Sequence, residues 1–415
     1  MTERPVIKIG SRKSLLALWQ TEHVQALLQA AHPHIDFEIV EETTHGDDVQ
    51  NVTLATLGTT NPGLFTKELE RSLLDGRTRM AVHSLKDMPT TLPPGLALGA
   101  IGEREDPCDA LVLHPKHALR CAGGAGLDGL PDGAVIGTSS LRREAMLRRR
   151  YPTFRFRPIR GNIHTRLAKL DGTFVKDGSY LAEGSSAALA AATGGGQDAA
   201  AVASDGTAAA DAPYDAIILA AVGLRRVGLG ERISAVLPAE AFPHAVGQGA
   251  LGVECREDDA EMIALLRGTA AAAAAAVAGG GGGGAGAGAG AGSVHHVPTA
   301  ARCLAERAVL RGLQGGCQIP LGVHSTISAD GMELSVHCQV LSLDGKLCVT
   351  GDIGGSAGDA EAMGAALAKQ LEADGADAIL KPGTRPITYS TVLLDADEQA
   401  PAPAAAPAAV TAEQA

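Results

Sequence analysis

Short apolar runs alternate with helical patterns along most of the chain, and this alternation limits the possible folds more than any other feature. Residues 80–82 and 216–220 are compact apolar runs, and residues 6–9 are apolar except for Lys8. Apolar residues at helical spacing fill many of the segments between such runs. A chain of this kind forms sheets whose faces are covered by helices. The sequence therefore predicts an α/β fold.

The predicted elements fall into three units. The first has strands at 6–9, near Phe37 and Ile39, and at 80–82, with helices after Ser14 and at 66–74. We expect Leu15, Leu18 and Trp19 to lie on one face of the helix that Ser14 caps. The second unit has strands at 135–137, 154–158 and 216–220, after which the strand at 250–255 returns to the first unit. The third has helices at 299–313 and 359–373 and strands at 333–340 and 346–350.

Three low-complexity stretches interrupt these units. They lie at about 172–211, at about 270–292 and at 397–415, and they consist largely of Ala with Gly, Ser or Pro. None carries enough large apolar side chains to offset the entropy lost on ordering, so we expect mobile loops and a disordered tail. The predicted domains are residues 1–105 together with 245–268, then 106–244, then 269–396.

Composition argues against several classes of function. A net charge of −12 over 415 residues disfavours a general nucleic-acid or membrane binder, because affinity for phosphate comes from accumulated Lys and Arg. Outside the Ala/Gly tracts no apolar span reaches 18 residues, and no apolar signal core follows Met1. The seven cysteines form no CxxC pair and no zinc spacing with histidine. We expect a cytoplasmic protein with no metal and with no membrane or nucleic-acid partner.

One cysteine stands in an unusual local sequence. Gly315 and Gly316 precede Cys317, and Pro320 stiffens the exit. Paired glycines beside a thiol indicate a sharp bend or a close approach by another group. A covalent role for Cys317 is one interpretation, and a buried cysteine in a tight turn is the other. The local sequence leaves both open.

Lys86 and Asp87 follow soon after the apolar run at 80–82. Polar groups at the carboxyl end of an α/β strand lie where ligands bind in open sheets. The alternative is an exposed Lys–Asp ion pair, which contributes little to stability. A Schiff base on Lys86 is disfavoured, because no phosphate-binding glycine loop of the pyridoxal kind accompanies it.

Nine arginines and a single acid lie between residues 142 and 166. Just before them, residues 137–140 lead a strand into a hydroxyl-rich helix start, where unpaired N–H groups and the helix dipole attract anions. The arginines at 148–150 are interpreted as charges at a helix end. Four of the remaining arginines favour a binding site for a ligand with several carboxylates or phosphates. They are Arg142, Arg143, Arg160 and Arg166.

Seven motifs occur in the order found in one known family. They lie at 11–20, 82–89, 103–107, 137–143, 160–162, 245–250 and 315–320. Together they resemble the porphobilinogen deaminase family, also called hydroxymethylbilane synthases, from about residue 6 to 380 outside the low-complexity stretches. The resemblance implies two periplasmic-binding-protein-like lobes with crossing hinge segments and a smaller α+β C-terminal domain. Residues 57–65 depart from the family's Gly/Lys-rich loop, which leaves the flap over the expected cleft undefined.

The resemblance implies a transferase of tetrapyrrole (haem-type) biosynthesis. Four porphobilinogen molecules lose ammonia and join head to tail on a dipyrromethane primer, and hydroxymethylbilane is released. The primer would be bound to Cys317 by a thioether. Asp87 would be the catalytic carboxylate, which stabilises the positive charge that deamination generates and manages its protons.

The same resemblance assigns the remaining site residues to cofactor binding or to substrate binding. Each pyrrole ring carries an acetate and a propionate, so the growing chain is a polyanion that guanidinium groups can bind bidentately. It implies that the cofactor is bound by Lys86, Ser140, Arg142, Arg143 and Arg166. It implies that the substrate is bound by Arg12, Ser14, Thr138, Arg160 and Arg226. We expect the protein to be a monomer.

Two other classes of function remain open from the residues alone. A non-catalytic two-lobed protein that binds a small polyanion would use the arginines but would give Cys317 no role. A nucleic-acid-binding module could use the arginines at 142–166, yet aromatic residues are only 3% of the chain and provide few stacking platforms.

Overall fold

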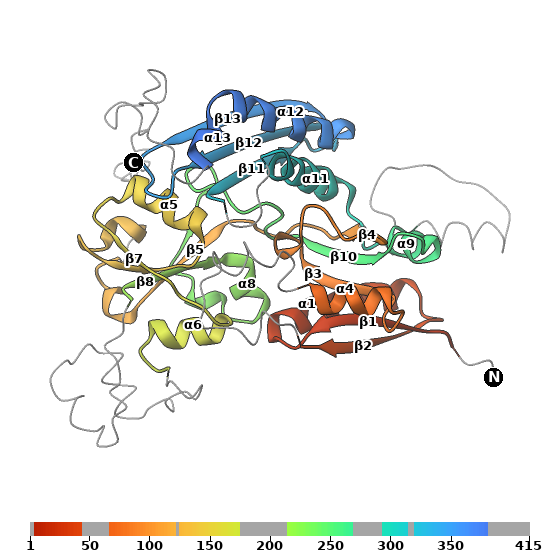
Figure 1. Ribbon diagram of the computed structural model, residues 1–415. Helices are drawn as coiled ribbons and strands as arrows, with labels where there is room; N and C mark the ends of the chain where they lie inside the picture. The colour runs from red at the N-terminus through yellow and green to blue at the C-terminus, as the bar shows by residue number, and fades with distance from the viewer. Residues whose placement is uncertain are drawn as a thin grey trace, which may run out of the picture.

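The computed structural model describes residues 4–43, 66–121, 124–174, 214–268, 293–313 and 319–380 (Figure 1). Within these ranges the chain forms two five-stranded sheets and one three-stranded sheet, each packed against helices. The predicted α/β class is confirmed. The low-complexity stretches lie almost entirely outside the described residues, as do Cys317 and residues 57–65.

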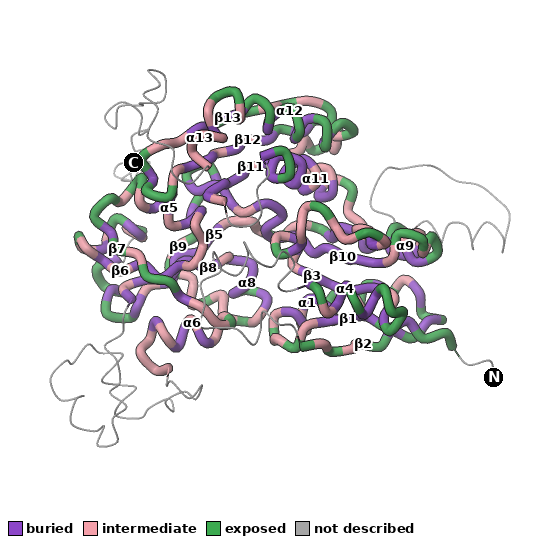
Figure 2. The backbone as a smooth tube through the Cα atoms, viewed as in Figure 1, coloured by how far each residue is buried: buried purple, intermediate pink, exposed green. Residues whose placement is uncertain are grey.

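The first lobe is built on a sheet with the strand order β2-β1-β3-β10-β4. Its strands are β1 (Val6–Arg12), β2 (Asp36–Glu42), β3 (Met80–Ser84), β4 (Leu96–Ile101) and β10 (Leu251–Arg256). Its helices are α1 (Leu15–Ala31), α4 (Lys67–Leu74) and α9 (Ala260–Leu266). Apolar residues of α1 and α9 share one core with the sheet, and α4 forms a separate cluster with Ala81 and Leu96. The sheet is thus buried between helices (Figure 2).

The second lobe repeats this arrangement with the order β7-β6-β8-β5-β9. Its strands are β5 (Asp109–Leu113), β6 (Val135–Gly137), β7 (Arg155–Arg157), β8 (Ala216–Ala220) and β9 (Ala235–Leu237). Helix α5 (Leu141–Arg150) contributes to one core of this sheet, while α6 (Ile163–Leu170) and α8 (Ala221–Arg226) contribute to the other.

Two hinge segments, residues 102–108 and 238–250, connect the lobes side by side. In each sheet the fourth strand arrives from the other lobe and runs antiparallel to both of its neighbours: β10 in the first lobe and β5 in the second. The amide of Gly102 donates to Leu251 O at 2.9 Å. Gly249 has a positive φ of 93°, and a Cβ there would lie 2.5 Å from Glu105 O, so only glycine allows this approach. The predicted crossing of two periplasmic-binding-protein-like lobes is confirmed.

The third domain packs two long helices on one face of an antiparallel sheet. Its strands are β11 (Leu321–Ile327), β12 (Glu333–Leu341) and β13 (Cys348–Ser356), and its helices are α11 (Val297–Gly312), α12 (Ala360–Ala373) and α13 (Ala376–Leu380). Residues of α11, α12 and the three strands form one hydrophobic core. In Figure 1 this domain lies above both lobes. The domain boundaries predicted from the sequence stay a prediction.

Leu15, Leu18 and Trp19 follow one another at i, i+3 and i+4 on one face of α1, but this is not the most buried face of the helix. Leu15 is 65% exposed, and the helix instead packs through Ala17, Thr21, Val24 and Leu28. At about 100° per residue, Leu15 is rotated roughly 200° from Ala17, which turns its side chain away from the sheet. The strands β4, β5, β9 and β11 were not predicted. None of the helices in the described ranges is long and apolar enough to cross a membrane.

Candidate active site

The first lobe contributes the start of α1. Arg12 ends β1, and Ser14 caps the helix, with its Oγ accepting a hydrogen bond from Ala17 N at 3.3 Å. Leu16 in the first turn of α1 and Ile163 in the first turn of α6 both approach Gly223 of the second lobe. The start of α1 therefore lies near the start of α6, which follows Arg160.

Lys86 and Asp87 lie in a short 3-10 turn (Leu85–Asp87) that follows β3. Lys86 Nζ donates to Gln248 Oε1 at 3.3 Å, and burial lowers the pKa of Lys86 to about 8 despite the attraction of Asp87. Asp87 is exposed, and no described residue forms a hydrogen bond or an ion pair with its carboxylate. Within the described ranges the alternative of a Lys86–Asp87 ion pair is therefore not observed.

The second lobe contributes the start of α5, where hydroxyl groups cap the helix. Ser140 Oγ accepts a hydrogen bond from Arg143 N at 3.4 Å, and Thr138 Oγ1 accepts one from Ser140 N at 3.1 Å. The side chain of Ser139 bonds Ile159 in both directions, as donor to its carbonyl at 2.8 Å and as acceptor from its amide at 3.1 Å. These hydroxyls join the helix start to the segment that leads to Arg160.

Asp109 holds the two arginines at this helix start. Its carboxylate is buried and lies 2.8 Å from Arg142 Nη1 and 2.8 Å from Arg143 Nη2. The guanidinium groups keep the pKa of Asp109 well below its usual range, against the effect of burial. Each arginine also donates to a backbone carbonyl, Arg142 to Pro243 O at 2.7 Å and Arg143 to Ile218 O at 2.9 Å. Sequence reasoning missed Asp109, although it opens the apolar run that becomes β5.

Gln248 connects the two sides of the site through the hinge. Besides accepting from Lys86, it donates through Nε2 to Asp109 Oδ1 at 2.9 Å and to Pro107 O at 2.6 Å. A chain of hydrogen bonds thus runs from Lys86 in the first lobe to Arg142 and Arg143 in the second. Gln248 belongs to a motif that the sequence analysis identified, but that analysis assigned it no role.

Arg160 and Arg166 lie on the same side as the arginine pair. Burial lowers the pKa of both, to about 10 for Arg166, where repulsion by Arg143 adds to burial and attraction by Asp87 opposes it. Arg166 Nε donates to Gly161 O at 2.8 Å. Asp87 of the first lobe thus acts electrostatically on Arg166 of the second. We call the residues gathered here the inter-lobe site: Arg12, Ser14, Lys86, Asp87, Thr138, Ser140, Arg142, Arg143, Arg160 and Arg166.

The inter-lobe site has buried hydrogen-bond donors for which the described part of the chain supplies no acceptor. Arg142 Nε, Arg143 Nε and Arg160 Nη1 are buried, and no described residue accepts from them. A buried guanidinium nitrogen without a hydrogen-bond acceptor lowers the stability of the folded protein. The donor set therefore fits a ligand that carries several carboxylates.

Arg226 lies at the hinge and is already paired. Its guanidinium lies 2.7 Å from Glu105 Oε1, donates to Gly249 O at 2.9 Å, and stacks 5.5 Å from the centre of the Trp19 ring. These contacts hold the lobes together at the hinge. The predicted contact of Arg226 with substrate stays a prediction.

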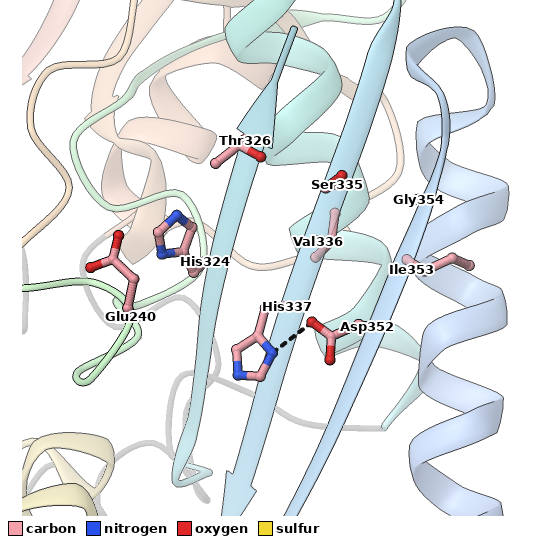
Figure 3. Close-up of a pocket in the computed structure, with 9 residues that line it drawn as sticks. All are labelled: Glu240, His324, Thr326, Ser335, Val336, His337, Asp352, Ile353 and Gly354. Atoms are coloured by element: carbon pink, nitrogen blue, oxygen red, sulfur yellow. Dashed lines mark hydrogen bonds and ion pairs between the residues drawn. The ribbon is translucent and has the colours of Figure 1, made fainter. Parts of the chain in front are cut away.

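A hollow of about 550 Å³ lies elsewhere, on the face of the third sheet that α11 and α12 leave uncovered (Figure 3). His337 Nδ1 bonds Asp352 there at 2.8 Å, and His324 lies opposite His337 on the neighbouring strand. The hollow contains no residue of the inter-lobe site. Among described residues, no group of three or more His, Cys, Asp or Glu side chains is arranged to hold a metal ion.

Comparisons with known proteins agree along the chain. The family model "Porphobilinogen deaminase, dipyromethane cofactor binding domain" matches residues 7–193 and 206–264, and "Porphobilinogen deaminase, C-terminal domain" matches 300–373. The porphobilinogen deaminase of Synechococcus elongatus is 44% identical over 374 residues, which is 90% of this chain and 94% of that protein. The porphobilinogen deaminase of Gloeobacter violaceus is 45% identical over 373 residues, which is 90% of this chain and 92% of that protein. The chain therefore belongs to the porphobilinogen deaminase family.

Proposed function

We propose that the inter-lobe site carries out the family reaction with Asp87 as the catalytic carboxylate. The reaction joins four porphobilinogen molecules head to tail on a dipyrromethane primer and releases hydroxymethylbilane and ammonia. Asp87 is exposed, has no partner among described residues and attracts the Arg166 cation electrostatically. A carboxylate in this state can face the pyrrole N–H groups, stabilise positive charge and move protons at its oxygens. The single observation that carries the proposal is this unpaired carboxylate opposite buried guanidinium donors.

The arginines and hydroxyls bind and orient the polyanion in this proposal. Arg142 and Arg143 are already oriented by Asp109, so little conformational entropy is lost when their remaining N–H groups meet carboxylates. With Lys86, Ser140 and Arg166 they hold the cofactor. Arg12, Ser14, Thr138, Arg160 and Arg226 bind the acetate and propionate groups of the substrate.

The side chain of Lys86 loses its positive charge at moderately alkaline pH in this site. Its pKa of about 8 means that it carries its charge at neutral pH and loses it as the pH rises. The cation attracts a ligand carboxylate, and Gln248 fixes the direction of its Nζ.

Cys317 holds the dipyrromethane by a thioether in this proposal. When bound, the dipyrromethane supplies the primer on which the new chain is built. The sequence around Cys317 supports the assignment, and Cys317 lies within residues 300–373, which match the C-terminal domain of the family.

The intact mass of the denatured, purified protein tests the covalent assignment. We expect a mass above that of the polypeptide by one dipyrromethane, because only a covalent bond survives denaturation. The addition should be lost in Cys317→Ser and kept in the matched control Cys348→Ser, whose thiol is half-buried in the third sheet. An unmodified chain in active wild-type protein would contradict the role of Cys317.

We also propose that the protein works in the cytoplasm as a monomer without nucleic acid. The net charge of −12 supports the absence of a polyanionic macromolecular partner. Retention on heparin at moderate salt would contradict this, and a dimer mass in light scattering would contradict the monomer.

A further inference from the structure

Arg307 of the third domain reaches into the first lobe beside Asp87. It lies in α11 and is only 4% exposed. Its Nη2 donates to Pro89 O at 2.5 Å, and its Nη1 donates to Met88 O at 3.4 Å. These two residues directly follow Asp87 in the chain. A helix of the third domain therefore holds the backbone next to the proposed catalytic carboxylate.

The guanidinium of Arg307 is buried without a carboxylate. No described acidic side chain lies within ion-pair distance of it, and burial lowers its pKa to about 10. The described partners of this cation are carbonyl oxygens, and a buried charge without a charged partner carries a large desolvation cost. Stability alone therefore does not explain an arginine at this position.

The neighbouring residue fixes the same helix to the hinge. Glu306 lies 2.6 Å from Arg104 Nη1 in the first hinge segment, and it accepts from Gly247 N in the second at 2.9 Å. Helix α11 is thus anchored to both hinge segments, one residue before Arg307. The position of the third-domain helix is set relative to the hinge, and Arg307 extends that constraint to Met88 and Pro89.

The segment after Asp87 transmits the constraint because it is stiff. Pro89 has a fixed φ, and the residue before a proline is confined to extended backbone, as Met88 is with φ −82° and ψ 139°. Holding the carbonyls of Met88 and Pro89 therefore orients the peptide planes that lead back to Asp87.

We infer that Arg307 is a positioning residue for the family reaction. By holding the carbonyls of Met88 and Pro89, it fixes the position of Asp87 relative to the third-domain helix α11. The inference rests on the proposed catalytic role of Asp87. Asp87 would act at every addition of a pyrrole, so loss of Arg307 should slow all four additions alike. Substrate binding uses other residues, so kcat should fall while KM stays nearly unchanged.

A double-mutant cycle with Arg307→Met and Asp87→Asn tests the inference. Methionine keeps much of the side-chain volume but removes both hydrogen bonds. We expect Arg307→Met to retain its dipyrromethane by intact mass and to unfold within about 4 °C of wild type. Its turnover should fall by about ten- to a hundredfold, the scale of an ångström-sized misplacement. The double variant should be no slower than Asp87→Asn alone, because Arg307 acts through Asp87.

Arg311→Met is the matched control. Arg311 lies one turn further along α11, its side chain is 44% exposed, and it donates to Thr90 O at 3.4 Å and pairs with Glu361 at 3.4 Å. We expect its turnover to change less than about threefold, as for a surface contact. An equal loss in Arg311→Met and Arg307→Met would indicate general damage to the domain contact and would overturn the inference.

The two possible failures are distinguishable. If Asp87→Asn is slow but the two substitutions multiply their effects, the role of Arg307 is overturned and that of Asp87 stands. Near-normal turnover of Asp87→Asn overturns the proposed role of Asp87 itself. If Arg307→Met does not fold, Arg307→Lys serves in the same cycle. An ammonium lacks the two separate nitrogens with which Arg307 holds the two carbonyls, so wild-type turnover in Arg307→Lys would overturn the inference.

Discussion

The two sides of the inter-lobe site differ in how their charges are held. In the second lobe, Arg142 and Arg143 share the buried carboxylate of Asp109 and each donates to a backbone carbonyl. In the first lobe, Asp87 is exposed and has no partner among described residues. The guanidinium groups of the second lobe are oriented before any ligand arrives. The carboxylate of the first lobe is left accessible to a ligand. This difference suits arginines that bind and a carboxylate that reacts.

Burial explains why the two sides are built differently. Two guanidinium groups buried side by side repel each other, so the arginine pair depends on the shared carboxylate of Asp109 for the stability of the fold. Asp87 remains hydrated and costs the fold little. Substitutions on the second-lobe side should therefore affect stability, whereas substitutions of Asp87 should affect turnover alone.

The largest expected effect is on stability, at Asp109. Asp109→Ala leaves two buried guanidinium groups without their carboxylate, so we expect the free energy of unfolding to fall by about 3–5 kcal/mol. Chemical denaturation of the full chain measures this. Asp171→Ala, which breaks the more exposed pair with Arg232, should cost about 1 kcal/mol or less. Equal losses in both variants would remove the distinction between the two sides.

The next effect is on turnover, at Asp87. Asp87→Asn keeps the size and part of the hydrogen bonding but removes the charge, so turnover should fall at least about a hundredfold, or about 2.7 kcal/mol in the barrier. The melting temperature should hardly change. Asp352→Asn, on an exposed strand of the third sheet, is a control that should leave turnover intact. A loss of stability that matches the loss of turnover would show that Asp87 is structural.

The four arginines sharpen the comparison, because they should not share one defect. Arg142→Leu and Arg143→Leu disturb the preoriented pair, so these variants should fail to hold the primer or stop at an early ring. Arg160→Leu and Arg166→Leu should each slow one addition by about 2 kcal/mol, which corresponds to roughly thirtyfold. Native mass spectrometry should resolve different numbers of bound pyrroles. Four variants with the wild-type distribution of intermediates would contradict an elongation track.

The smallest expected effect is the pH dependence that Lys86 imposes. Its pKa is lowered from 10.5 to about 8 by burial, so the cation is lost as the pH rises through about 8. Binding of porphobilinogen to cofactor-free protein should weaken above that pH, and Lys86→Arg should bind with little change there. From about 8 to 10.5 the unfolded chain keeps a proton that the folded protein has released, so stability should rise with pH. Calorimetric titration at several pH values measures the binding, and a flat wild-type profile would contradict the role of Lys86.

Much of the fold was predictable because local sequence controls it. The predicted strands near 6–9, 80–82, 216–220 and 250–255 and the helices near 66–74 and 359–373 are all present. Ser14, Ser140 and Asn162 lie at helix starts and cap them. Residues three positions apart decide such features, so they can be read from the sequence.

The site was predictable only in part. Lys86, Asp87 and the arginines were identified by residue type, motif and family resemblance, and the structure places them around two facing lobes. Asp109 and Gln248 were missed as site residues, because their roles come from partners that are distant in sequence. Lys86 and Gln248, for example, are 162 positions apart.

The amino-acid sequence by itself determined the α/β elements, their caps, the excess of arginine in one segment and the family of the chain. Only the tertiary structure decided which charges are paired, which carboxylate stays exposed, and that Arg307 of the third domain holds the backbone beside Asp87. The physical reason is that helical and strand periodicity depend on neighbours along the chain, whereas burial and ion pairing depend on neighbours in space. Those spatial neighbours are set by the crossing of the two hinge segments and by the docking of α11 against them.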